Sequence, residues 1–200
     1  MTLDGFPHHA ALRDGSALIL SAFTADDAEE LKALYRSMSE EDRLALKDDV
    51  TSEEWARRFV DRAKAGELIS VVARLADGKL VGEGTLYRAA FGWTRHVGEL
   101  RVNVAASERR QGVASALVTE LVRVASSLGV EKVITLMVEN QVAAQRAFEK
   151  HGFRREATLP GHVKTLRGAK RDLQVWSNDI AHAWTLMEDM TSDVGPDLGD

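Results

Sequence analysis

The chain predicts a mixed α/β fold, with helices on both faces of a mostly antiparallel sheet. Three strand-like runs follow one another in the middle of the chain, which predicts antiparallel pairing. Later strand runs alternate with helical patterns, and such crossovers require some parallel pairing. The 200 residues and the 44% apolar fraction suit one domain, expected over residues 1–190. Residues 191–200 are acidic and contain Gly and Pro, so we expect a disordered tail.

The first half of the chain reads as one strand followed by helices. Ala17–Phe23 is the strand, and Thr24 caps the next helix with Asp27 in the capping-box position. A short helix is expected over Ser39–Leu46, and a third begins at Ser52 and stops at Gly66. The turn Ala76-Asp77-Gly78 then predicts a hairpin between strands Leu68–Leu75 and Lys79–Arg88.

The second half alternates strands and helices. Its expected elements are strand Val97–Val104, helix Gly112–Leu128, strand Lys132–Val138, a helix from Asn140 to about His151, strands Phe153–Leu159 and Leu173–Ser177, and a last helix from a cap at Asn178 to Met190.

Composition excludes several function classes. A net charge of -5 argues against a general nucleic-acid binder. The absence of cysteine removes disulfides, thiolate zinc sites and a cysteine nucleophile. The six histidines lack the spacing of metal ligands, so we expect no metal. Neither a signal peptide nor an apolar run of about 18 residues is present, so we expect no membrane contact and a cytoplasmic location.

The segment Arg109-Arg110-Gln111-Gly112-Val113-Ala114 lies between a predicted strand and a long helix. Gly112 and Ala114 allow the backbone to approach a ligand closely. Unpaired amides at a helix start, with the positive end of the helix dipole, make a site for a diphosphate. Arg109 and Arg110 would add charge-assisted contacts. Such a loop alone is also compatible with an ordinary strand–helix turn.

The surrounding motifs make the resemblance specific. The loop has the form R-x-x-G-x-A and resembles the acyl-CoA pyrophosphate loop of the GNAT (Gcn5-related N-acetyltransferase) superfamily. The later run Ala147-Phe148-Glu149-Lys150-His151-Gly152-Phe153 is similar to the end of that family's Asn-led helix. The likeness covers Val97–Phe153 closely, and the rest of the chain by the order of its elements.

The resemblance implies a fold and a cofactor. Strands 97–104 and 132–138 would separate at the centre of the sheet, and the pantetheine arm of acetyl-CoA would lie in the gap, as an added strand. The implied cofactor-binding residues are Val102 and Val104 through their backbone, the amides of Gln111, Gly112, Val113, Ala114 and Ser115, the side chains of Arg109 and Arg110, Asn140 near the thioester, and Phe148. Asn140 can equally be a plain helix cap.

Glu99 is the candidate general base, because acetylation of an ammonium ion needs a proton acceptor. It stands mid-strand, where glutamate has low β propensity, beside the implied thioester. The fragment Gly98-Glu99-Leu100-Arg101-Val102-Asn103-Val104 resembles a strand of bacterial protein lysine acetyltransferases, whose catalytic glutamate matches Glu99. The alternative is a solvent-facing glutamate paired with Arg101.

The general acid is unassigned. Many GNAT enzymes have a tyrosine where this chain has Phe148, and phenylalanine cannot donate a proton. Tyr87, His96 and His151 are candidates, although the place of His151 at a helix end favours a surface or capping role.

We therefore expect an N-acetyltransferase that uses acetyl-CoA to acetylate a primary amine, either a protein lysine or a small molecule. A homodimer is possible on this reading. The alternative is an acyl-CoA-binding regulatory module without turnover, which Phe148 motivates. The aromatic loop Ala89–His96 either lines the acceptor pocket or packs over the sheet.

Overall fold

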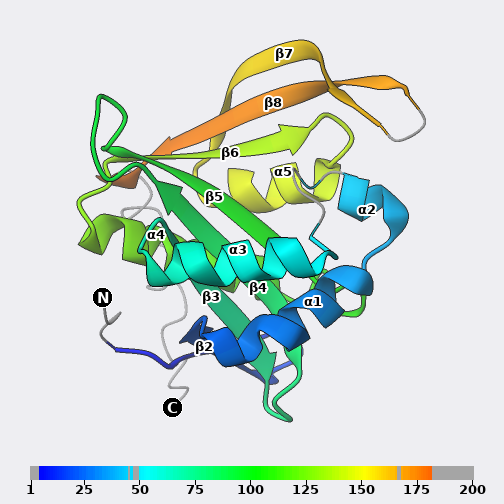
Figure 1. Ribbon diagram of the computed structural model, residues 1–200, viewed down its shortest axis with the longest axis vertical. Coiled ribbons are helices and arrows are strands. Elements are labelled where there is room, and N and C mark those ends of the chain that lie inside the picture. Colours follow the sequence, from blue (N-terminus) through cyan, green and yellow to red (C-terminus); the bar gives the residue numbers. More distant parts are fainter. Residues whose placement is uncertain (1–4, 45, 47–49, 166–167, 182–200) are drawn as a thin grey trace, which may run out of the picture.

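The computed structural model describes residues 5–44, 46, 50–165 and 168–181. One sheet of eight strands runs through the molecule in the order β1-β2-β3-β4-β5-β6-β8-β7 (Figure 1). The strands are β1 His8–Ala11, β2 Ala17–Ala22, β3 Leu68–Leu75, β4 Leu80–Arg88, β5 Val97–Val104, β6 Lys132–Val138, β7 Arg154–Lys164 and β8 Lys170–Asp179. The helices are α1 Ala28–Arg36, α2 Glu40–Leu44, α3 Glu53–Lys64, α4 Val113–Ser127 and α5 Val142–Glu149, with short 3-10 turns at Ala25–Asp27 and Ala106–Glu108.

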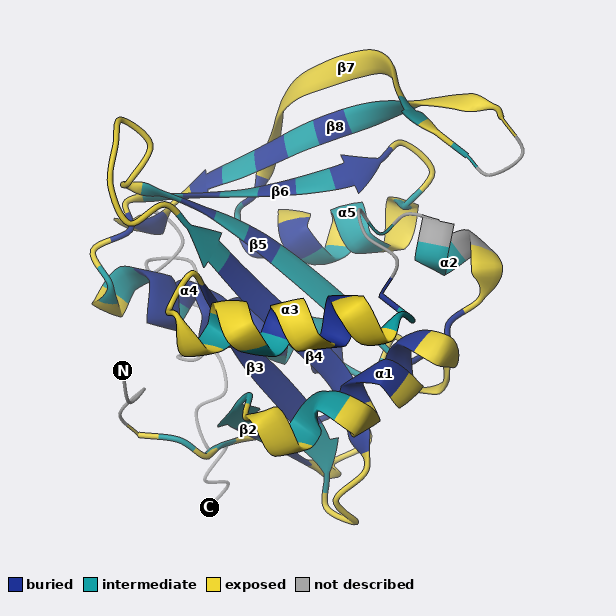
Figure 2. Cartoon of the chain, in the orientation of Figure 1, coloured by how far each residue is buried: buried dark blue, intermediate teal, exposed yellow. Residues whose placement is uncertain are grey.

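The predicted mixed sheet is confirmed. Every neighbouring pair is antiparallel except β5 and β6, which are parallel and are joined through α4. Helices α1 and α3 cover one face, where Leu31, Trp55 and Phe59 pack against Leu68 and Val72 of β3. Helices α4 and α5 contribute to a second apolar cluster on the opposite face. Figure 2 shows that β3 and β4, between these layers, are almost wholly buried.

Two glycines in β4 let α4 pack close to the sheet. A Cβ atom at Gly82 would lie 2.9 Å from Val113 Cγ1, and one at Gly84 would lie 2.8 Å from Leu121 Cδ1. Both distances are shorter than a van der Waals contact between carbon atoms. The glycines therefore fix how closely the start of α4 approaches the strands.

Strands β5 and β6 separate along their length. They pair only from Val97 with Lys132 to Glu99 with Ile134. Beyond this point β5 remains paired with β4 through Val104, while β6 pairs with β8 through Val138 (Figure 1). The expected separation of strands 97–104 and 132–138 is therefore confirmed.

Some boundaries differ from the expectation. The sequence did not predict β1, whose four residues give too short a pattern to recognise. Asn178 does not cap a helix, because it lies inside β8 and pairs with Val133. Asp179 ends β8, and helical backbone begins at Ile180 and Ala181. Residues 182–190 of the expected last helix, and the expected tail, lie outside the described residues. Among the helices that the structure describes, none is long and apolar enough to span a membrane.

Candidate active site

The start of α4 presents unpaired backbone donors. Its first intrahelical bond runs from the Ala116 amide to the Gly112 carbonyl, at 3.0 Å. Helix geometry therefore leaves the amides of Val113, Ala114 and Ser115 without intrahelical acceptors. Gly112 precedes them with a φ of 105° and provides no side-chain cap. A Cβ added at Gly112 would meet nothing within 4 Å, so there is open space beside Gly112 itself.

Of the two loop arginines, one is held by an acidic partner. Arg109 Nη2 lies 2.8 Å from Asp42 Oδ2, on α2. Burial raises the pKa of the Asp42 carboxyl, but hydrogen bonds from Ser39 and Arg109 outweigh burial, and the pKa is lowered overall. Arg110 is exposed and has a positive φ of 66°. An anion bound at the loop would therefore compete with Asp42 for Arg109.

A cavity of about 460 Å³ lies beside these donors. Gln111, Gly112 and Ser115 line it on the α4 side, and β1 with Arg13 lines it on the other. The Arg13 amide donates to the Gln111 carbonyl at 2.9 Å, which fixes the loop against the segment that follows β1. The segment that follows the unpredicted strand β1 therefore supports the loop that the sequence singled out.

The free edge of β5 presents the backbone of Val102 and Val104. The Ala105 amide donates to Val81 in β4, at 2.8 Å. Backbone groups alternate in direction along a strand, so those of Val102 and Val104 point away from β4. Because β6 has already diverged, these groups border the gap between the strands.

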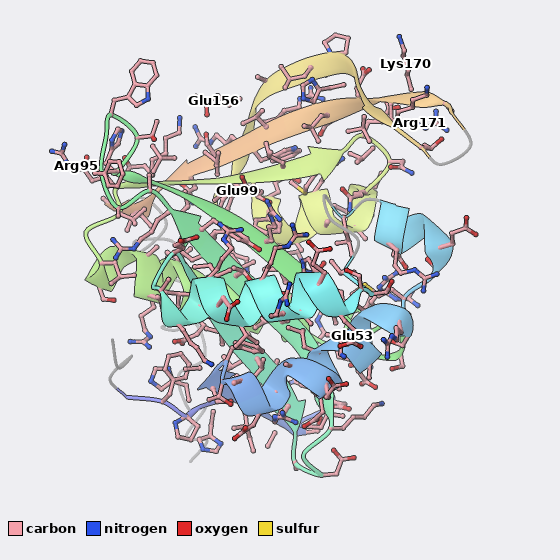
Figure 3. The ribbon with its side chains drawn as sticks, viewed as in Figure 1. Glu53, Arg95, Glu99, Glu156, Lys170 and Arg171 are labelled. Atoms are coloured by element: carbon pink, nitrogen blue, oxygen red, sulfur yellow. The ribbon has the colours of Figure 1, made fainter. Side chains whose placement is uncertain are left out.

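Glu99 lies where the two strands part, since it is the last β5 residue paired with β6 (Figure 3). It stands opposite Tyr87 of β4, so its side chain lies on the sheet face covered by α1 and α3. Arg101 Nε donates to Glu99 Oε1 at 2.9 Å, and the Glu99 side chain is 22% exposed. The Arg101 guanidinium in turn lies 4.3 Å from the centre of the Tyr87 ring. The pair that the sequence offered as an alternative therefore exists, and it leaves the carboxylate within reach of solvent.

The sequence analysis missed a second acidic residue on the same face, Glu83 of β4. Glu83 is 1% exposed. Its carboxylate accepts hydrogen bonds from four side chains. Tyr35 Oη lies at 2.9 Å, Ser70 Oγ at 2.8 Å and Asn103 Nδ2 at 3.3 Å, and Thr85 Oγ1 is the fourth donor. Burial raises the pKa of Glu83, although these hydrogen bonds oppose the shift. A glutamate in mid-strand, the signal that drew attention to Glu99, would also have found Glu83.

The remaining candidate site residues differ in how far they are buried. Phe148 is in the core, with its ring 5.0 Å from that of Phe153 in an edge-to-face contact. His151 is 2% exposed, so the surface role favoured for it is wrong. His96 is exposed, and Asn140 is exposed in the turn before α5, whose N-cap is Gln141.

The loop between β4 and β5 does not pack over the sheet. Phe91 is 84% exposed and Trp93 is 93% exposed, so the packing role offered for these aromatic side chains is wrong. A role in acceptor binding stays a prediction.

Together, the open helix start, the unpaired strand edge and the carboxylate beside it form the arrangement that the sequence analysis expected for an acyl-transfer enzyme that binds an acyl-CoA. The chain belongs to the acetyltransferase (GNAT) family, whose model matches residues 28–153. This confirms the resemblance drawn from the loop and from the helix end.

Known proteins agree with this assignment. The chain is 26% identical over 83 residues to the "Putative phosphinothricin acetyltransferase YwnH" of Bacillus subtilis (strain 168), a match covering 42% of this chain and half of that relative. The GNAT domain of S. lividans PAT has the same fold, with a TM-score of 0.74 and 19% identity over 90% of this chain and 99% of that one. The Salmonella typhimurium protein yncA, solved with its cofactor acetyl-CoA, superposes with a TM-score of 0.72 and 17% identity, over 82% of this chain and 94% of that one.

Proposed function

We propose that this chain is an N-acetyltransferase that transfers the acetyl group of acetyl-CoA to a primary amine. The observation that carries the proposal is the alignment of three features along β5. Uncapped amides at the start of α4 follow the strand, Val102 and Val104 present a free edge near its end, and Glu99 stands where β6 departs.

The residues present fit a coenzyme A molecule. The amides of Val113, Ala114 and Ser115, with the helix dipole, favour a diphosphate. The open space at Gly112 accommodates it, and the edge of β5 can pair with the amide groups of the pantetheine arm. When bound, acetyl-CoA supplies the thioester from which the amine takes the acetyl group.

Glu99 acts as the general base. Its carboxylate accepts a proton from the acceptor's ammonium group, directly or through a water molecule, and the freed amine can then attack. Of the two carboxylates on this face, Glu99 is the accessible one, whereas Glu83 is sealed by Tyr35 and its other donors. The C–N bond forms and the C–S bond breaks. The nitrogen gives up its second proton as the amide forms, and the departing thiolate takes up a proton from the amine or from solvent, because Phe148 cannot supply one. Glu99 then returns its proton to solvent.

The acceptor is a primary amine of a small molecule or of a protein. The likeness of the strand around Glu99 to protein lysine acetyltransferases favours a lysine side chain. The name of the Bacillus subtilis relative favours a small amine. A panel containing both kinds of acceptor is therefore the appropriate screen.

The test combines acetyl-CoA binding with thiol release. We expect the wild-type chain to bind acetyl-CoA in calorimetry and to release CoA thiol with an amine of the panel. Glu99→Gln should keep the binding but lower kcat about 10²- to 10⁴-fold. Glu156→Gln is a matched control, because Glu156 is also in an ion pair, with Lys132, but lies on β7 (Figure 3).

Three outcomes would contradict parts of this proposal. Failure to bind acetyl-CoA would overturn it entirely. Binding without thiol release across the whole panel would favour the regulatory module that Phe148 motivates. Full activity in Glu99→Gln would exclude Glu99 as the base.

A further inference from the structure

His151, directly after α5, is buried beside the start of α4. It is 2% exposed, and its backbone is held on both sides. The His151 amide donates to the Phe148 carbonyl at 2.9 Å, and Asn178 Nδ2 of β8 donates to the His151 carbonyl at 2.6 Å. The His151 backbone is therefore held by α5 and β8 together.

Among the residues that the structure describes, the imidazole makes one hydrogen bond, to a residue of the predicted diphosphate loop. Its Nε2 lies 2.7 Å from Ser115 Oγ. Its Nδ1 is buried, and within the described residues it has no hydrogen-bond partner. Burial, with a smaller contribution from Lys150, lowers the pKa of His151, so the ring is neutral near neutral pH.

A neutral imidazole carries one N–H group, and its environment selects the tautomer. A proton on Nδ1 would leave a buried donor unsatisfied, which is rarer and costlier than a bare acceptor. We therefore assign the proton to Nε2, which donates to Ser115 Oγ. The hydroxyl hydrogen of Ser115 is then left to donate to another group.

Ser115 stands in the first turn of α4 and lines the cavity beside Gln111 and Gly112. A hydroxyl that donates from this position adds a side-chain hydrogen bond to the backbone donors of the same turn. We propose that His151 is a positioning residue for acetyl-CoA, which orients the Ser115 hydroxyl as a donor to the diphosphate. This inference rests on the proposed function and adds to it a side chain from α5.

The proposal predicts that the two residues act as a unit. Ser115→Ala should raise the Kd for CoA about tenfold, the usual effect of losing a hydrogen bond to a charged group. His151→Leu should raise it by a factor between about three and ten. The double variant should bind as Ser115→Ala does, within about twofold, because His151 acts only through the serine.

Several controls separate positioning from folding. Ser127→Ala removes a hydrogen-bonded hydroxyl at the other end of α4, and His162→Leu removes an exposed histidine of β7. His151→Gln retains an N–H donor and should restore part of the affinity. In kinetics, His151→Leu should raise the KM for acetyl-CoA more than it lowers kcat, and it should affect S-acetylpantetheine, which lacks the diphosphate, much less.

The outcomes separate failure of this inference from failure of the proposed function on which it rests. The inference is supported if the double variant binds CoA as Ser115→Ala does and if His151→Gln restores part of the affinity. It is also supported if the loss is confined to ligands that contain the diphosphate. Independent effects that multiply, or equal losses with CoA and S-acetylpantetheine, would overturn it while the proposed function stands. A wild-type chain that binds no CoA would overturn the proposed function itself.

Discussion

Glu83 and Glu99 project from neighbouring strands on one face of the sheet, but their surroundings differ. Tyr35 of α1 donates to Glu83, which is 1% exposed, whereas Glu99 is paired with Arg101 and its side chain is 22% exposed. The two residues look alike in the sequence, since each is an acid in mid-strand beside a glycine. Their difference depends on α1, which contributes a residue 48 positions before Glu83, and no local pattern contains that information.

The buried carboxyl makes stability depend on pH in a definite direction. The folded-state pKa of Glu83 is raised above its ordinary value of 4.5, so the folded chain holds this proton at higher pH than the unfolded chain. The stabilising contribution of Glu83 is therefore complete below about pH 4.5 and is lost as pH rises through the folded-state pKa. As pH rises from about 4.5 through the folded-state pKa, we expect the free energy of unfolding of Glu83→Gln to increase relative to that of the wild type. Urea unfolding measured from pH 4 to 8 tests this. A difference that stays constant with pH would contradict this.

The contribution of the Tyr35 hydroxyl, which donates to Glu83, can also be measured. Burial, with the nearby Glu83, raises the pKa of Tyr35 well above its usual range, so the hydroxyl remains a donor. Tyr35→Phe should lower the free energy of unfolding by about 1–3 kcal/mol, because it removes a donor to a buried carboxylate. The same change in a Glu83→Gln background should cost less. Equal losses in both backgrounds would show that ring packing dominates.

At the scale of elements, α4 is bounded by two glycines with positive φ. Gly112 precedes it at 105° and Gly129 follows it at 70°, and an added Cβ would meet nothing within 4 Å at either. Alanine at either position should therefore destabilise the fold by about 1–2 kcal/mol through backbone strain alone.

The two substitutions should differ in ligand binding. Gly112→Ala places a methyl group in the space proposed for the diphosphate and should weaken CoA binding at least tenfold, whereas Gly129→Ala should not change it. Thermal unfolding and calorimetry on both variants provide the comparison. Equal CoA affinity in the two would place the diphosphate elsewhere.

Helices and strands with a strong hydrophobic pattern could be predicted from the sequence, whereas features fixed by contacts between distant segments could not. Strands 97–104 and 132–138 have the expected bounds, because the second is a β-branched run and the first alternates polar with apolar residues from Glu99 to Val104. Asn178 has the local character of a helix cap, but pairing with β6 keeps it in β8. His151 follows a helix end, yet α4 and β8 enclose it. In each case tertiary contact overrode a local preference.

At the scale of the whole molecule, the loop motif was enough to predict where the candidate site lies. Its parts, a strand, a glycine and a helix start, follow one another in the sequence. The Asp42–Arg109 pair and the support from β1 could not be foreseen, since they join segments far apart in the chain. Residues that line a site from a distance are set by topology rather than by motif.

Ligand binding should stabilise the folded chain as a whole. Acetyl-CoA at about 100 times its Kd should raise the free energy of unfolding by about 2.7 kcal/mol, since the unfolded chain has no assembled site. Glu99→Gln should show the same rise, because its loss is in turnover rather than binding. Thermal unfolding with and without the ligand measures both, and an absent shift in wild type would argue against the site.

The outermost strand, β7, has a consequence for solubility. Ten of its eleven residues are exposed, and a long unprotected edge of this kind invites further strands to add to a sheet. Its pairing with β8 shifts register twice, between Arg155 and Ala157 and between Leu159 and Val163, and Pro160 lies in the second interruption. Irregular spacing, a missing amide donor and basic side chains make this border a poor template for fibril growth. Among the described residues, the edge of β5 is thus the one proposed to pair with a ligand, whereas we expect the edge of β7 to resist pairing with a further strand.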